Sequence, residues 1–184
     1  MIDSKQAAEA LADIDDIVQR VRQSRIYDLA SQMMILWGVL VFAANIATWL
    51  WPHGAYYDWL AVYVLGIAGS FAISASNQAS TGVRSFDMRV LLAFLMFVAF
   101  GFLCAHVLGH FTPRQQGAFW TIYVMLFYAL AGLWFGTAFV VIALGITALT
   151  LIGYFFVTGD AFLPWMAVVN GGGPIVGGLW MRRS

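Results

Sequence analysis

Residues 117–157 read GAFWTIYVMLFYALAGLWFGTAFVVIALGITALTLIGYFFV, a run of 41 residues without a charged side chain. A single helix of this length, rising about 1.5 Å per residue, would be about 60 Å long, roughly twice the thickness of the hydrocarbon core of a bilayer. The run is therefore expected to fold back on itself. Gly136 and Thr137 mark the turn, because glycine relaxes the backbone and threonine can cap the helix that follows.

Comparable apolar runs fill the rest of the chain beyond residue 28. Of the 184 residues, 62% are hydrophobic and 10% are charged, whereas a soluble domain has roughly 45–50% apolar and about 25% charged residues. This composition predicts an all-α integral membrane protein in contact with the lipid bilayer. Six transmembrane helices of roughly 20 residues each are expected, at about 29–51, 59–76, 88–109, 117–135, 138–157 and 162–181.

The nine lysine and arginine residues are unevenly divided among the gaps between these segments. Those before the first segment, in or at the edge of the second gap, or after the last segment are Lys5, Arg20, Arg22, Arg25, Arg84, Arg89, Arg182 and Arg183. Only Arg114 lies in an odd-numbered gap, the third, which would face the other side of the membrane. Because positive charge is retained on the cytoplasmic side during insertion, the pattern predicts a multi-pass protein of a bacterial-type inner membrane with both termini in the cytoplasm.

Residues 1–28 are expected to form a cytoplasmic amphipathic helix that precedes the bundle of residues 29–184. The apolar residues at the 3-4-3 spacing of a coiled-coil seam are Leu11, Ile14, Val18 and Val21. Two interpretations stay open: the helix lies on the bilayer or under the bundle, or it docks a second copy or a cytosolic protein partner. Acidic residues in its first two-thirds disfavour adhesion to anionic lipid, so we favour protein contact, including a homo-oligomer.

The last segment contains Asn170-Gly-Gly-Gly-Pro174, which is expected to kink or partly unwind its helix. Close packing against a neighbouring helix is the simpler explanation. The alternative is a set of exposed carbonyls that line a ligand site, as in the broken helices of transporters. Asn45 and Asn170 also carry amides that need partners in lipid. The candidate ligand-binding residues are therefore Asn45, Asn170, Gly171, Gly172 and Gly173.

The three histidines, His53, His106 and His110, fall at the outer ends of segments or in outer gaps. His106 and His110 are four residues apart, the spacing at which two imidazoles on one helical face can share a metal. Together with His53 they would suit zinc or copper, or a bis-histidine haem. Solvated loop histidines and a packing histidine are the simpler interpretation, because no HExxH motif or histidine-rich box accompanies them.

No catalytic, nucleotide-binding or nucleic-acid-binding pattern is present in the sequence. We therefore predict no nucleic-acid partner and favour a non-enzymatic sensor, regulatory or accessory subunit. It would bind a lipid or small apolar ligand and contact a partner through its N-terminal helix. A small channel or facilitator for an uncharged solute is the first alternative. An outward-facing, histidine-ligated metal or haem protein is the second.

Overall fold

The computed structural model describes residues 4–81, 88–109 and 111–183, with side chains at 13, 14, 17, 21, 23–79, 92–109 and 111–183. The α-helices are α1 Ser4–Leu50, α2 Ala55–Thr81, α3 Met88–Val107, α4 Pro113–Phe135, α5 Thr137–Phe156, α6 Phe162–Met166 and α7 Gly173–Met181. A π-helical segment, Ala167–Gly172, joins α6 to α7, so that residues 162–181 form one helical run. The described chain is all-helical, as the composition predicts.

Five helical stretches in the described ranges are long and apolar enough to cross a membrane. They are Gln23–Leu50, Pro52–Ala79, Pro113–Phe135, Thr137–Phe156 and Gly159–Met181. A shorter apolar stretch, Leu92–Val107, lies in α3. Each of the six segments expected from the sequence thus lies largely within a helix, and the third coincides with α3.

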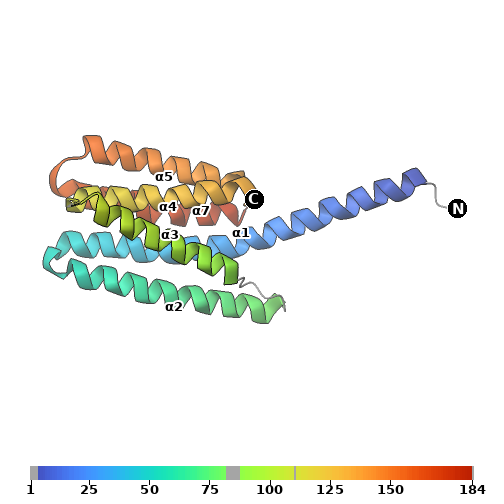
Figure 1. Ribbon diagram of the computed structural model, residues 1–184, viewed down its shortest axis with the longest axis horizontal. Helices are drawn as coiled ribbons and strands as arrows, with labels where there is room; N and C mark the ends of the chain where they lie inside the picture. Colours follow the sequence, from blue (N-terminus) through green and yellow to red (C-terminus); the bar gives the residue numbers. More distant parts are fainter. Residues whose placement is uncertain (1–3, 82–87, 110, 184) are drawn as a thin grey trace.

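The first helix, α1, is a single helix of 47 residues. Its length is about 70 Å, more than twice the thickness of the hydrocarbon core. Figure 1 shows its second half inside the bundle and its first half extending away from the other helices. We call residues 4–22, which precede the apolar stretch Gln23–Leu50, the projecting segment. The helix continues unbroken across residue 28, and the expected division of the chain there stays a prediction.

The bundle has two ends that are distinguished by its turns. At the projecting end, α1 leaves the bundle, the α4–α5 turn lies at Gly136, and the chain finishes after α7 (Figure 1). At the opposite end lie the turns from α1 to α2, from α3 to α4 and from α5 to α6. Inside the bundle, α1 packs against α2, α6, α7 and the π-helical segment, while α4 and α5 form a closely packed hairpin.

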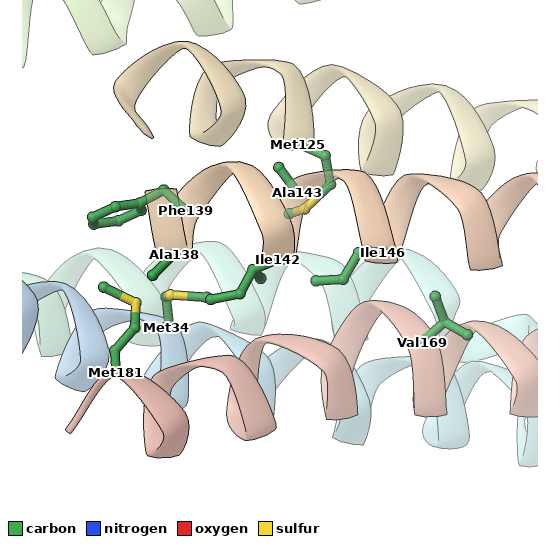
Figure 2. Packing of buried hydrophobic residues seen from close by; sticks show 9 residues of the cluster. All are labelled: Met34, Met125, Ala138, Phe139, Ile142, Ala143, Ile146, Val169 and Met181. Atoms are coloured by element: carbon green, nitrogen blue, oxygen red, sulfur yellow. The ribbon is translucent and has the colours of Figure 1, made fainter. Parts of the chain in front are cut away.

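A compact apolar cluster joins α5 to its neighbours. Its buried members are Met34, Met125, Ala138, Phe139, Ile142, Ala143, Ile146, Val169 and Met181. Figure 2 shows Ile142 and Ile146 on the side of α5 that faces the last helical run. There they meet Gly177 and Gly173, where an added β carbon would lie 2.8 and 2.9 Å from them. Glycine on one helix and isoleucine on the other let the two backbones approach closely.

The turn expected at Gly136 is confirmed, but the expected cap is wrong. α4 ends at Phe135 and α5 begins at Thr137, with Gly136 alone between them at φ 136° and ψ 154°. This backbone conformation is essentially restricted to glycine. Gly136 itself is the N-cap of α5, and no side chain caps this helix. Thr137 does not cap α5 because a one-residue turn already places it inside the helix.

Candidate functional site

The glycines of the last helical run place it directly against α1. A β carbon added to Gly38 would lie 2.7 Å from the carbonyl oxygen of Gly171. One added to Gly171 would lie 2.5 Å from Phe42 Cα. Such distances are well inside van der Waals contact, so neither position accommodates a larger residue without a backbone shift. Close helix packing, the simpler of the two explanations, accounts for Gly171.

The expected distortion of this run takes the form of the π-helical segment Ala167–Gly172. In a continuing π-helix the carbonyl of Val169 would pair with the nitrogen of Pro174, which carries no hydrogen. The N–H of Gly173 instead donates to the carbonyl oxygens of both Val168 and Val169. The segment therefore widens the helix without leaving these carbonyls unpaired. Single π-turns of this kind occur frequently at functional sites.

The two asparagines differ in their surroundings. Asn45 is buried, and its Nδ2 atom donates to the carbonyl oxygen of Val41, one turn earlier in α1, at 2.8 Å. Asn170 is half-buried within the π-helical segment. Gly173 packs against α5, whereas a β carbon added to Gly172 would meet no atom within 4 Å. Ligand binding by Asn45, Asn170 and the three glycines stays a prediction.

The candidate metal ligands are placed only in part. His53 is exposed in the short turn Pro52–Gly54, and His106 is exposed in the last turn of α3. His110 lies outside the described residues. Among the residues that are described, no group of three or more His, Cys, Asp or Glu side chains is arranged to hold a metal ion. Metal or haem binding at His53, His106 and His110 stays a prediction.

The projecting segment carries apolar side chains that the described residues leave about half exposed. Ile14, Ile17 and Val21 are 55%, 60% and 48% exposed. The side chains of Leu11 and Val18, the other two predicted seam residues, lie outside those that the structure describes. At the described positions, the predicted contact surface is therefore open to a partner.

Arg114, the exception to the charge distribution, ties α4 to the end of α5. Its Nη2 atom donates to the carbonyl oxygens of Gly153, at 3.0 Å, and of Tyr154 and Val157. The Gly153 carbonyl also accepts from the Val157 N–H, whereas the last carbonyls of a helix generally lack intrahelical donors. A cation at a helix C-terminus also interacts favourably with the helix dipole. The guanidinium carbon lies 4.6 Å from the ring centroid of Phe162. The sequence alone marks Arg114 only as the exception to the charge distribution.

A capping box at the start of α4 sets the position of Arg114. The Thr112 side chain accepts from the Gln115 N–H, and the Thr112 N–H donates to Gln115 Oε1 at 2.9 Å. Pro113 occupies the first turn, where its missing N–H has no consequence. The order Thr-Pro-Arg-Gln at 112–115 is the sequence signal that could have located this site.

Arg114 also lines a pocket of about 370 Å³ at the opposite end of the bundle, which we call the Arg114 pocket. Its other side chains include Thr48, Trp49, Asp160, Phe162 and Leu163. The volume lies in the range of about 300–1,000 Å³ that is typical of small-molecule sites. The pocket thus joins the end of α1, the start of α4 and the turn that leads into α6.

Comparisons with protein-family models, with curated proteins and with solved structures find no match for this chain. Its class therefore follows from its own architecture. The chain is all-helical in the ranges described, and five of its helical stretches are long and apolar enough to cross a membrane. These features define a multi-span helical architecture suited to a lipid bilayer.

Proposed function

We propose that the protein is a six-span, non-enzymatic regulatory or accessory subunit of a bacterial-type inner membrane, and that it assembles through the projecting segment. In this proposal α3 crosses the membrane in addition to the five long apolar stretches, which gives six spans, and both termini are cytoplasmic. The projecting end carries Arg25, Arg182 and Arg183, whereas Arg114 lies at the opposite end with its guanidinium bonded to backbone carbonyls. This distribution supports the orientation, because exposed positive charge is retained in the cytoplasm.

The observation that carries the proposal is the exposure of Ile14, Ile17 and Val21 on a helix that has left the bundle. Lipid covers apolar side chains along membrane spans, so exposure there has no further meaning. The projecting segment, however, continues the helix for about 28 Å beyond the apolar stretch that begins at Gln23. Ile14 and Ile17 lie about 14 and 9 Å before Gln23 along this helix. Apolar side chains there face water unless a protein covers them.

A second copy of the chain is the partner that fits this surface best. Leu11, Ile14, Val18 and Val21 occupy alternating a and d positions of a heptad pattern. Copies inserted in one membrane with the same orientation present these positions in parallel and in register. About three heptads would associate weakly in solution, but tethering to the membrane raises their effective concentration.

The residue types at the seam indicate how many copies assemble. Both d positions, Ile14 and Val21, are β-branched, and the a positions are Leu11 and Val18, so the first pair is leucine at a and isoleucine at d. Leucine at a with isoleucine at d favours three or four strands over two. We therefore expect a trimer or a tetramer. Because α1 continues into the bundle and packs there against α2, α7 and the π-helical segment, these are the elements that a change in this contact would reach first.

Native mass spectrometry of the full chain, released from detergent micelles, tests this proposal. The wild-type protein is expected to give three or four copies. The double variant Ile14→Asp/Val21→Asp is expected to be monomeric, since it places charges within the seam. Asp13→Asn, an exposed position beside the seam, is the control and is expected to keep the wild-type subunit number.

Circular dichroism of the same samples separates loss of assembly from loss of folding. The double variant is expected to retain the helical signal of the bundle. A wild-type monomer would contradict the proposal, as would a double variant with an unchanged subunit number.

A further inference from the structure

The Arg114 pocket contains one positive and one negative side chain that do not neutralise each other. Arg114 and Asp160 both line it, yet no ion pair with an N···O distance of 4.0 Å or less joins them in the described structure. Asp160 is exposed in the short turn Gly159–Ala161 that precedes α6. Two opposite charges that line one pocket are suited to a ligand that carries both signs.

The guanidinium of Arg114 is fixed in place but retains donors. Its recorded hydrogen bonds to α5 use Nη2, whereas a guanidinium has five N–H groups distributed over three nitrogens. The Nη2 contacts and the Phe162 ring hold the group at the pocket. The N–H groups on Nε and Nη1 match the oxygens of a phosphate, for which arginine is a favoured partner.

The remaining pocket side chains suit the part of a lipid where polar and apolar groups meet. Trp49, Phe162 and Leu163 supply apolar surface. The hydroxyl oxygen of Thr48 is buried without a hydrogen-bond partner in the described structure, although Thr48 lines the pocket. A buried hydroxyl without a partner is unfavourable, so a ligand that bonds to it gains free energy. Tryptophan also prefers the level of lipid head groups.

The pocket lies level with the ends of several of the long apolar helical stretches. It lies where α1 ends and the α5–α6 turn crosses the opposite end of the bundle (Figure 1). If the long apolar helices cross the bilayer, this end lies at the head-group level of one leaflet. A phospholipid can then enter from the side and keep its acyl chains in the bilayer.

We propose that the Arg114 pocket binds the head group of a zwitterionic phospholipid that carries a primary ammonium next to its phosphate. Arg114 holds the phosphate, Asp160 accepts hydrogen bonds from the ammonium, and Thr48 bonds to a phosphate or ester oxygen. A quaternary ammonium has no N–H to donate to Asp160, and the hydroxyls of a glycerol head group offer its carboxylate only neutral donors, which bind more weakly than a charged ammonium. Phosphatidylethanolamine is therefore preferred over phosphatidylcholine and phosphatidylglycerol.

The test is a lipid titration of the full chain, followed by native mass spectrometry. Phosphatidylethanolamine, phosphatidylcholine and phosphatidylglycerol with identical acyl chains are the three probes. One bound phosphatidylethanolamine per chain is expected, with about tenfold tighter binding than for the other two, or about 1.4 kcal/mol. Equal binding of all three lipids would overturn the proposal.

Two variants at the pocket and two matched controls test the assignment of the side chains. Asp160→Asn is expected to remove the preference by weakening phosphatidylethanolamine binding about tenfold. Asp28→Asn, which removes a carboxylate near the projecting end, is expected to leave the preference for phosphatidylethanolamine unchanged. Thr48→Val is expected to weaken binding about fivefold. Thr150→Val is its control, because Thr150 also has a buried hydroxyl without a described partner but does not line the pocket.

Arg114 is not replaced in this test, because its replacement would also remove the hydrogen bonds to the end of α5. Unchanged binding in both Asp160→Asn and Thr48→Val would overturn the site. A competition arm with free phosphoethanolamine identifies the source of the head group. If free phosphoethanolamine at equal concentration does not displace the bound lipid, the result supports a lipid as the ligand. Full displacement of the lipid would overturn that assignment and indicate a soluble zwitterion as the ligand.

This proposal stands apart from assembly through the projecting segment, which lies at the other end of the bundle. The same spectra report both properties. A monomer that prefers phosphatidylethanolamine overturns only the assembly. An oligomer without lipid preference overturns only the pocket.

Discussion

Gly171 lies so close to Phe42 that a β carbon on Gly171 would be 2.5 Å from the Phe42 Cα atom. The contact joins two residues that are far apart in the sequence and brings the π-helical segment directly onto α1. It makes the backbone of the last helical run part of the packing surface. The adjacent Gly172 has no such neighbour.

Gly171→Ala is expected to lower the free energy of unfolding by about 2–3 kcal/mol, because overpacking here displaces backbone and not a flexible side chain. Gly172→Ala is the matched control. It is expected to be neutral or to raise stability by up to about 1 kcal/mol, since alanine fits a helical conformation better than glycine. Thermal unfolding in detergent, followed by circular dichroism, measures both. An equal loss of stability in Gly171→Ala and Gly172→Ala would contradict the packing explanation.

Gly136→Ala is expected to be strongly destabilising for two separable reasons. The φ of 136° costs an alanine about 1–3 kcal/mol, and its β carbon would lie 2.0 Å from the Tyr27 hydroxyl oxygen. Adding Tyr27→Phe removes the overlap with the hydroxyl. It leaves the backbone cost and two contacts of 2.9 Å, to the ring carbon Cζ of residue 27 and to Gln23 Nε2, so the double variant is expected to recover only part of the stability.

Gly145→Ala provides the control for this pair, because Gly145 lies inside α5 and an added β carbon there meets no atom within 4 Å. It is expected to unfold at or above the wild-type temperature. Full recovery in Gly136→Ala/Tyr27→Phe would show that the backbone conformation carries no cost.

Arg114→Gln is expected to lower the free energy of unfolding by about 2–3 kcal/mol, because carbonyls at the end of α5 lose a charged donor. Arg114→Lys is expected to lower the free energy of unfolding by less, since lysine keeps a cation near the helix C-terminus although it lacks the planar donor set of arginine. Gln116→Ala, exposed two residues later, is the control. Equal unfolding temperatures for Arg114→Gln and Gln116→Ala would argue against the bonds to α5.

The proposed orientation predicts opposite labelling of the two ends of the bundle. In a Cys104→Ser background, a cysteine at Thr158 is expected to react with a membrane-impermeant maleimide in intact spheroplasts. A cysteine at Arg183 is expected to react only after the membrane is permeabilised. Both native residues are exposed, so burial does not limit the reaction. The reverse pattern would invert the predicted topology.

The helical segments could be predicted because they depend on local properties. The 41-residue run at 117–157 is too long for one span, and Gly136 is the position in its middle where the backbone turns. The capping role assigned to Thr137 was wrong, because the length of a turn depends on how the two helices pack. The continuity of α1 across residue 28 was likewise not evident, since composition changes there while helix propensity does not.

The candidate sites were harder to predict, because they depend on which helices pack against each other. The glycine run could be recognised as unusual, but its contact with Phe42 depends on which helix lies beside it. Arg114 was seen only as an exception to the charge distribution. Its carbonyl acceptors lie about forty residues further along the chain, and the Arg114 pocket combines residues from three separate parts of the sequence.

The sequence by itself determined the all-helical class, the positions of the helical segments and the unequal distribution of charge. These follow from hydropathy and backbone preference, which act over one or two helical turns. Only the tertiary structure decided that Gly171 packs on α1, that Arg114 bonds to the end of α5, and that Asp160 and Thr48 share a pocket with it. Those contacts depend on the order and rotation of helices in the bundle, which no local stretch of sequence specifies.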